Sequence, residues 1–167
     1  FAVRVAREFS TDAPVNFNHA VGICPLLDPI RSTRIIDDIA WLRRYFMQKW
    51  FRGLKKKAAA FPDIYDFSEV YRMKNCWEMT EALIRRYSNY PRVEDYFDRY
   101  TITGERLSGI TVPTTIVTAA DDPVIPVSDF HRLKLSDSTR LHIAAHGGHC
   151  GFIENWKLES WVNRVMP

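Results

Sequence analysis

Short apolar runs alternate along this chain with segments of helical periodicity. Residues 20–24 form one such run before Pro25, residues 114–120 form a second after Pro113, and residues 140–144 form a third. Apolar runs of this length, rich in β-branched residues and bounded by proline or polar clusters, are typical of strands. Since strands that alternate with helices form parallel sheets, the sequence predicts an α/β fold.

Helices are expected at both ends of the chain and before the last strand. Phe1, Val5 and Phe9 recur at four-residue steps, which predicts a helix at the start of the sequence. We expect a further helix over residues 130–135 and a closing amphipathic helix over about residues 156–165. No internal repeat is evident.

The longest helical region extends from about residue 32 to residue 100. Its first part carries an aromatic-rich stripe, which we expect to be core, although it could also line an apolar substrate pocket. The stripe consists of Trp41, Leu42, Tyr45, Phe46, Trp50, Phe51 and Leu54. Pro62 is expected to end this helix, and the pattern of residues 67–84 indicates one or two more.

Basic residues are concentrated in residues 31–57. This segment contains nine Lys and Arg and two Asp, which gives a local net charge of +7. Our interpretation is a solvated helix face. The alternative is a surface that attracts phosphates or an anionic membrane. The whole chain has a net charge of only +3, which is too small to indicate a nucleic-acid binder.

The composition narrows the class of protein further. The 167 residues are 46% hydrophobic and 26% charged, which excludes a disordered or collagen-like chain. No apolar run reaches the ~20 residues that cross a bilayer. The cysteines Cys24, Cys76 and Cys150 are widely spaced and form no CxxC pair, which argues against a disulfide framework. We therefore expect a reducing, cytoplasmic location.

Acidic and histidine residues follow two successive strands. Asp121 and Asp122 come after the run that ends at residue 120, and His146 and His149 come after the run that ends at residue 144. Sites in open α/β sheets form beyond the carboxyl ends of the strands. An Asp that accepts a hydrogen bond from an imidazole makes the acid–base half of a nucleophilic triad. Taken singly, an Asp-Asp-Pro turn and a histidine in a glycine-rich loop are more often structural, but together they favour catalysis.

Three stretches carry a resemblance to a known family. Residues 1–6, 113–126 and 147–152, with weaker agreement between them, resemble the C-terminal half of an α/β-hydrolase. The resemblance is to the group that includes the bacterial YheT-like hydrolases and the eukaryotic ABHD-type lipases. It implies a partial α/β-hydrolase fold over residues 1–167, with a helical lid inserted at residues 31–107.

The resemblance also implies roles for the residues at the strand ends. Family members follow the order Ser, Asp, His, so Asp122 is the expected triad acid and His149 the expected general base. Asp121 is the less favoured acid, and His146 is expected to be a loop residue. The implied activity is hydrolysis of carboxylic esters, of lipid or of short-to-medium acyl groups, without a metal or other cofactor.

The nucleophile of that family lies in a Gly-x-Ser-x-Gly elbow, and none of the serines in this chain has such surroundings. By comparison with the family, the sequence is expected to begin just after the position of this elbow. We therefore expect a fragment whose Ser lies upstream and which is inactive alone, because loss of a triad Ser costs about a million-fold in rate. A strand over residues 20–24 would lose its neighbour, which predicts binding to the missing half or self-association through the exposed edge.

Two other classes of site are considered. His146, His149 and Cys150 with Asp122 contain plausible metal ligands, but they lack the rigid helical spacing of a zinc motif. A non-catalytic binding module would use the basic helix of residues 31–57 to contact anionic lipid or other phosphates. Direct contact with a membrane surface therefore remains an alternative partner to a small-molecule ester.

Overall fold

The computed structural model describes residues 1–12 and 16–165. The chain forms two compact units, one made of Phe1–Asp28 with Tyr100–Pro167 and the other of Pro29–Arg99. The second unit overlaps the helical insertion expected over residues 31–107, which stays a prediction. Residues 102 and 107 belong to the larger unit, because Ile102 N–H donates to the Leu27 carbonyl at 2.9 Å and Leu107 forms a parallel bridge with Leu135.

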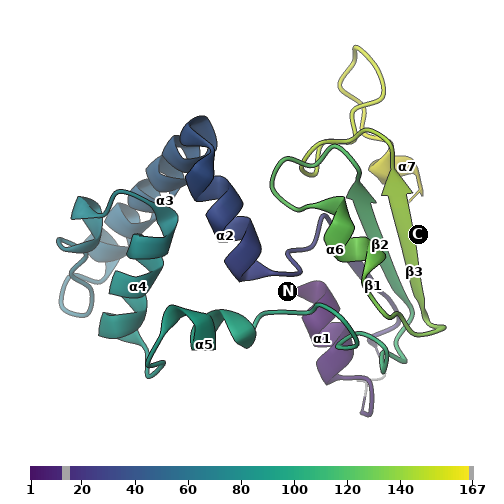
Figure 1. The fold of residues 1–167 in the computed structure, drawn as a ribbon, viewed down its shortest axis with the longest axis horizontal. Helices are drawn as coiled ribbons and strands as arrows, with labels where there is room; N and C mark the ends of the chain where they lie inside the picture. Colours follow the sequence, from purple (N-terminus) through teal and green to yellow (C-terminus); the bar gives the residue numbers. More distant parts are fainter. Residues whose placement is uncertain (13–15, 166–167) are drawn as a thin grey trace. The chain divides into compact units, whose positions relative to one another are not determined.

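The larger unit contains a parallel sheet in the order β1-β2-β3 (Figure 1). The strands are β1 (Ala20–Ile23), β2 (Thr114–Ala119) and β3 (Thr139–Ala144). Ala20 pairs with Thr114 and Thr114 pairs with Thr139, so the three strands start in register. The predicted α/β class with C-terminal parallel strands is confirmed, and each strand lies where its apolar run was found.

Strand β2 is the centre of the sheet and is buried at every position. A strand paired on both sides and covered on both faces reads as a continuous apolar or β-branched run, as its sequence TTIVTA does. The first two hydroxyls of the strand have partners, since Thr114 Oγ1 donates to the Val112 carbonyl and Thr115 Oγ1 pairs with His19 Nε2, each at 2.9 Å. The fixed position of β2 determines where the residues that follow it are held.

Three short helices accompany the sheet: α1 (Ala2–Glu8), α6 (Val127–His131) and α7 (Val162–Val165). Helix α1 approaches β1 closely at Gly22, where an added Cβ would lie 2.7 Å from Val3 Cγ2. The helix is confirmed, but its buried residues are Val3 and Ala6, whereas Phe1 and Phe9 of the expected stripe are 97% and 41% exposed.

The structure differs from the expectation at the two later helices. Helix α6 begins directly after Pro126 and ends at His131, because Lys134 N–H then donates to the Gly104 carbonyl at 2.9 Å and Leu135 pairs with Leu107. The chain therefore leaves the helix to pair with another segment.

The prediction of a closing helix over residues 156–165 is wrong for most of that range. Ile153 and Ser160 form an antiparallel bridge, so the chain folds back on itself and α7 starts at Val162. The connecting loop is held by Asn155 Oδ1, which accepts from the Lys157 N–H at 3.0 Å. Trp156, expected on an apolar helix face, is fully exposed at 102%.

The second unit is helical and consists of five elements. These are α2 (Pro29–Asp38), α3 (Ala40–Ala60), the 3₁₀ turn η1 (Val70–Arg72), α4 (Cys76–Tyr87) and α5 (Val93–Asp98). Helix α4 is capped at its start by Asn75, whose side chain accepts from the Glu78 N–H, and by Asp37, whose carboxylate accepts from the N–H groups of Cys76 and Trp77. One core cluster of this helical unit consists of Phe67, Val70, Met79 and Ala82.

Only part of the aromatic stripe of α3 forms the core face that the sequence predicts. Leu42 is the buried residue of this helix, all of which lies in the described part of the chain. Trp41, Tyr45 and Trp50 are 65%, 52% and 39% exposed. Phe51 and Leu54, which also belong to the stripe, pack against the unit's core. Spacing identified residues that share a side of the helix, but it could not say which side is covered.

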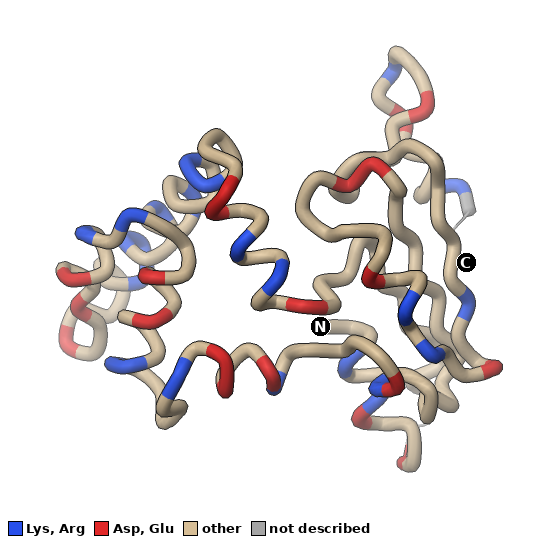
Figure 2. Tube along the Cα trace, in the orientation of Figure 1, with Lys and Arg blue, Asp and Glu red and all other residues tan. Residues whose placement is uncertain are grey.

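Helix α3 is also the longest helix, so its composition bears on membrane insertion. Lys and Arg recur along it (Figure 2). Within residues 1–12 and 16–165, no helix combines the length and the apolar character needed to cross a bilayer.

Candidate active site

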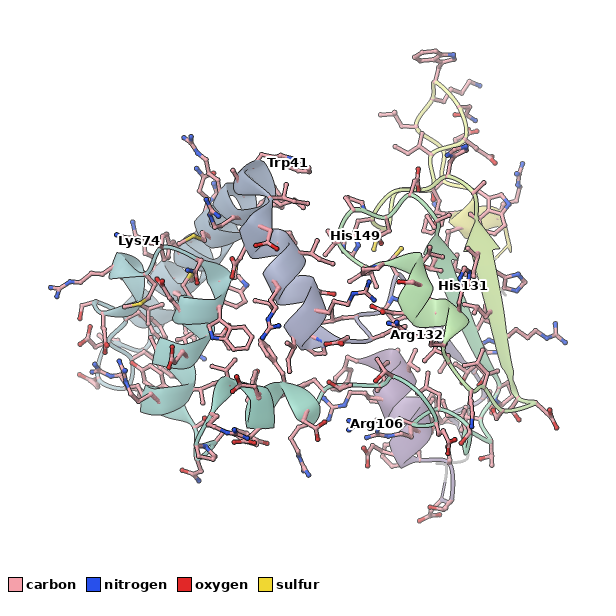
Figure 3. The ribbon with its side chains drawn as sticks, viewed as in Figure 1. Trp41, Lys74, Arg106, His131, Arg132 and His149 are labelled. Carbon is pink, nitrogen blue, oxygen red and sulfur yellow. The ribbon has the colours of Figure 1, made fainter. Side chains whose placement is uncertain are left out.

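The four polar residues identified at the strand ends form two Asp–His pairs in the larger unit. Ala119 pairs with Ala144, so β2 and β3 end side by side and the loops that follow them meet. Asp121 and Asp122 enter from the loop after β2. The two histidines enter from the loop after β3, and His149 is labelled in Figure 3.

Asp122 and His149 form the shorter pair. The distance from His149 Nδ1 to Asp122 Oδ2 is 2.9 Å. The Asp122 side chain is completely buried, whereas the His149 side chain is 37% exposed. The second carboxylate oxygen, Oδ1, accepts from the N–H groups of Val124 at 2.8 Å and Ile125 at 2.9 Å. The buried carboxylate is thus fixed by two backbone donors and presents its remaining oxygen to the imidazole.

The adjacent residue, Asp121, makes different contacts. Its Oδ1 accepts from the N–H groups of Gly148 at 2.8 Å and Gly147 at 2.9 Å. These two hydrogen bonds hold the pKa of Asp121 below its usual range, and the bond from Gly148 has the larger effect. Its Oδ2 is 3.6 Å from Nδ1 of His146, whose side chain is 90% exposed. Asp121 therefore anchors the histidine loop, and His146 extends into solvent.

Gly147 allows that loop to approach the end of β2. A Cβ at this position would lie 2.5 Å from Phe152 Cδ1 and 3.0 Å from Ala119 Cβ, closer than real Cβ atoms come. Phe152 is buried in a cluster with Val117 and other residues, and its N–H donates to the Gly147 carbonyl at 2.9 Å. The tight turn thus packs the loop that carries His149 onto the core of the sheet.

Two cysteines lie beside His149: Cys150, which the sequence offers only as a possible metal ligand, and Cys24, to which it assigns no role. Cys24 follows β1 and is buried, and Cys150 follows His149. Both have positive φ angles, 42° and 68°, which is uncommon for residues other than glycine. The strand-end argument that found the Asp and His residues could have found Cys24, because it comes directly after a strand in the same sheet.

The thiols are poor nucleophiles where they lie. Burial is the main cause that raises the pKa of Cys24 to about 12, and it also raises the pKa of Cys150. The Cys24 Sγ–H donates to the Gly148 carbonyl and the Cys150 Sγ–H donates to the Ile23 carbonyl, each at 3.8 Å. The thiols therefore remain protonated at neutral pH and link the loops after β1 and β3.

The metal ligands that the structure groups together differ from the set weighed from sequence. Among the described residues, one nitrogen of His149 and the sulfurs of Cys24 and Cys150 lie within 4.8 Å of one another. Asp122 is committed to His149 and to the backbone, and His146 lies against Asp121. The sequence found two members of this cluster and missed the third.

The Asp122–His149 arrangement can act as an acid–base pair. A carboxylate on Nδ1 fixes the proton on that nitrogen, so the lone pair of Nε2 is free to accept a proton. The same carboxylate stabilises the imidazolium that forms. Such a pair serves any nucleophile whose proton points at Nε2.

Sequence comparisons find several curated proteins that are similar to this chain. Human Protein ABHD15 is 33% identical over 120 residues, which are 68% of this chain and 25% of that protein. The Synechocystis protein named "Putative esterase slr0264" is 28% identical over 151 residues, 86% of this chain and 40% of that protein. Human Monoacylglycerol lipase ABHD2 is 28% identical over 127 residues, 71% of this chain and 29% of that protein.

The chain therefore spans about 25% to 40% of the length of these relatives. No family model matches the sequence. No solved structure matches it either.

Proposed function

Since this chain is homologous to α/β-hydrolases of the ABHD and YheT group, we propose that it carries two of the three members of a Ser-Asp-His triad. Asp122 is the acid, His149 is the general base, and the Ser is supplied by a segment upstream of this chain. The observation that carries the proposal is the 2.9 Å contact between His149 Nδ1 and a buried Asp122 oxygen.

In this mechanism His149 moves protons through Nε2. It takes the Ser proton as the hydroxyl attacks the ester carbonyl, and it then gives that proton to the departing alcohol. Water repeats the sequence on the acyl-enzyme and releases the acid. Asp122 keeps the ring in the Nδ1–H tautomer throughout, and its own orientation is kept by the Val124 and Ile125 amides.

The proposed substrates are carboxylic esters of lipid or short-to-medium acyl groups. One relative is named a monoacylglycerol lipase. The unit formed by Pro29–Arg99 is the proposed lid, and it contains a cavity of about 350 Å³ with an aromatic and aliphatic lining. That lining includes Trp50, Leu83, Ile84, Tyr87, Tyr96 and Phe97, which suits an acyl chain.

The proposed macromolecular partner is the upstream half of the hydrolase or a second copy of this chain. Strand β1 is at the edge of the described sheet and pairs with β2 alone there. An unpaired strand edge adds a further strand readily. Sedimentation velocity tests this point, since a monodisperse monomer at all concentrations contradicts self-association. The cytoplasmic location stays a prediction from cysteine usage.

The experiment that tests the catalytic proposal compares two chains. A chain extended upstream through the nucleophile elbow should hydrolyse short-chain p-nitrophenyl esters, and the 167-residue chain should not. Equal hydrolysis by both chains would show that the nucleophile lies within the shorter one. An inactive extended chain that still folds would count against ester hydrolysis.

A second candidate function is contact with an anionic lipid surface through α3. One observation favours it: the exposed Trp41 and Tyr45 share this helix with a set of exposed bases, a composition found in helices that lie at membrane interfaces. The exposed bases are Arg44, Lys49, Arg52, Lys55, Lys56 and Lys57.

Sedimentation with phosphatidylserine-containing vesicles tests the lipid contact. Binding should weaken as salt is raised, because exposed charges are screened. Lys49→Gln with Lys56→Gln should reduce it, whereas Arg140→Gln with Lys157→Gln, which removes equal charge from the other unit, should not. Equal effects of the two double variants would mean that α3 has no special role.

A further inference from the structure

The loops after β1 and β3 bring two thiols and one imidazole together. Cys24 and Cys150 are 126 positions apart in sequence (150 − 24), yet each donates a hydrogen bond to the backbone beside the other. A nitrogen of His149 and both sulfurs lie within 4.8 Å of one another, and Figure 3 shows His149 with sulfur atoms close by. All three residues belong to the larger unit.

This set of ligands has a recognisable chemistry. Two thiolates and an imidazole bind Zn²⁺ and other ions that prefer sulfur, and they discriminate against Mg²⁺ and Ca²⁺, which prefer oxygen. Two sulfurs around a tetrahedral ion with Zn–S bonds of about 2.3 Å lie about 3.8 Å apart. The three ligand atoms lie within 4.8 Å of one another, so they must close by up to about 1 Å when the ion binds.

The surroundings of His149 also suit a metal. Asp122 already engages Nδ1, so Nε2 is the nitrogen with a free lone pair. Metal-ligating histidines usually donate their other N–H to a carboxylate, which orients the ring and makes it a better ligand. The Asp122–His149 pair has that form before any ion arrives.

We propose that Cys24, Cys150 and His149 form a site for one thiophilic divalent ion such as Zn²⁺, bound through the two sulfurs and Nε2. Each thiol loses its proton to solvent as its sulfur binds, and a water molecule completes the fourth position. The ion is not a cofactor for ester hydrolysis. A consequence that rests on the proposed function is inhibition, because an ion on Nε2 occupies the lone pair that would accept the Ser proton.

Cobalt absorption tests the site on the reduced 167-residue chain without any need for activity. Co²⁺ added under anaerobic conditions should produce thiolate-to-metal charge-transfer bands and the visible bands of tetrahedral Co²⁺, saturating at about one ion per chain. Zn²⁺ should displace it. The absence of charge-transfer bands from the folded, reduced chain would overturn the proposal.

Variants assign the ligands. Cys150→Ser, at an exposed position, should lose about half of the charge-transfer intensity, and Cys24→Ser should do the same if it folds. His149→Ala should weaken binding, and Asp122→Asn should do so by about 10–100-fold. The controls Cys76→Ser and His146→Ala should leave the spectrum unchanged. Equal spectra for Cys150→Ser and Cys76→Ser would contradict the site.

A second readout avoids the risk that Cys24→Ser fails to fold. In the unmodified chain, Zn²⁺ should protect the exposed Cys150 from alkylation by N-ethylmaleimide, as located by peptide mass spectrometry. Unchanged alkylation of Cys150 with saturating Zn²⁺ would exclude its ligation. If the metal binds but the extended chain hydrolyses no ester, the proposed function fails while this site stands.

Discussion

Strand β2 and helix α3 belong to different units and are buried to very different degrees. Every residue of β2 is buried, whereas one residue of the 21 in α3, all of them described, is buried. The polar residues after β2 have fixed partners: Asp122 accepts three hydrogen bonds and Asp121 accepts two from the histidine loop. The aromatic residues of α3 mostly meet solvent. A completely buried strand fixes the positions of the polar residues that follow it. A helix that packs along one narrow face leaves its other residues exposed and able to contact a partner.

The largest effect expected from this contrast is on catalysis. In a chain extended through the nucleophile elbow, His149→Ala should lower kcat by about a million-fold, as loss of a triad histidine does. His146→Ala removes a similar side chain three positions away that is 90% exposed, and it should change kcat little. Hydrolysis of p-nitrophenyl butyrate measures both. Unchanged activity in His149→Ala would refute the role assigned to this residue.

The contrast in burial predicts a difference in stability. Phe130 is 1% exposed in α6, so Phe130→Ala should cost about 3–5 kcal/mol of the free energy of unfolding. Trp41 is 65% exposed in α3, so Trp41→Ala should change it by less than about 0.5 kcal/mol. Urea unfolding followed by circular dichroism gives both values. A large cost for Trp41→Ala would mean that α3 is covered in solution.

A smaller effect is expected from the tight packing of the histidine loop. Gly147→Ala places a Cβ 2.5 Å from Phe152 Cδ1, so it should destabilise the chain by about 1–3 kcal/mol. Gly109→Ala is the matched control, because a Cβ there meets nothing within 4 Å. Thermal unfolding compares the two variants. Equal melting temperatures would show that the loop is not packed on the sheet as described.

The smallest effect concerns the anchoring of that loop by Asp121. The N–H groups of Gly148 and Gly147 lower the pKa of Asp121, so its stabilising contribution is present above the ordinary value of 3.8 and is lost as pH falls through the lower folded pKa. The amide resonances of Gly147 and Gly148 should titrate together below pH 3.8 in the unmodified chain. They should not titrate there in Asp121→Asn, and a midpoint above 3.8 would contradict the anchoring.

The sequence predicted the sheet and the Asp–His pairs because both depend on local features. Apolar β-branched runs locate the strands, and parallel strands bring their carboxyl ends together, so the two Asp residues are expected near the two His residues. The choice of Asp122 with His149 came from the resemblance to the hydrolase family. The bond from Asp121 to the Gly148 amide could not be foreseen, since it depends on the exact turn of a glycine-rich loop.

Features that depend on contacts between distant segments were missed. The pairing of Leu107 with Leu135 shortens α6, and the bridge between Ile153 and Ser160 replaces the first part of the closing helix. Cys24 follows a strand of the same sheet, so the strand-end argument could have included it, although its distance from His149 depends on the β1-β2-β3 order. Periodicity, finally, does not distinguish a covered face of a helix from an uncovered one, as Trp41 demonstrates.

The central claim is that Asp122 fixes the proton of His149 on Nδ1 and leaves Nε2 free as a base. NMR of the chain with ¹⁵N-labelled histidine tests this directly, because protonated and unprotonated ring nitrogens have well-separated shifts. We expect His149 to be protonated on Nδ1 at neutral pH, and we expect Asp122→Asn to remove this preference while Asp121→Asn does not. A His149 ring protonated on Nε2 in the unmodified chain would show that Asp122 does not set the tautomer.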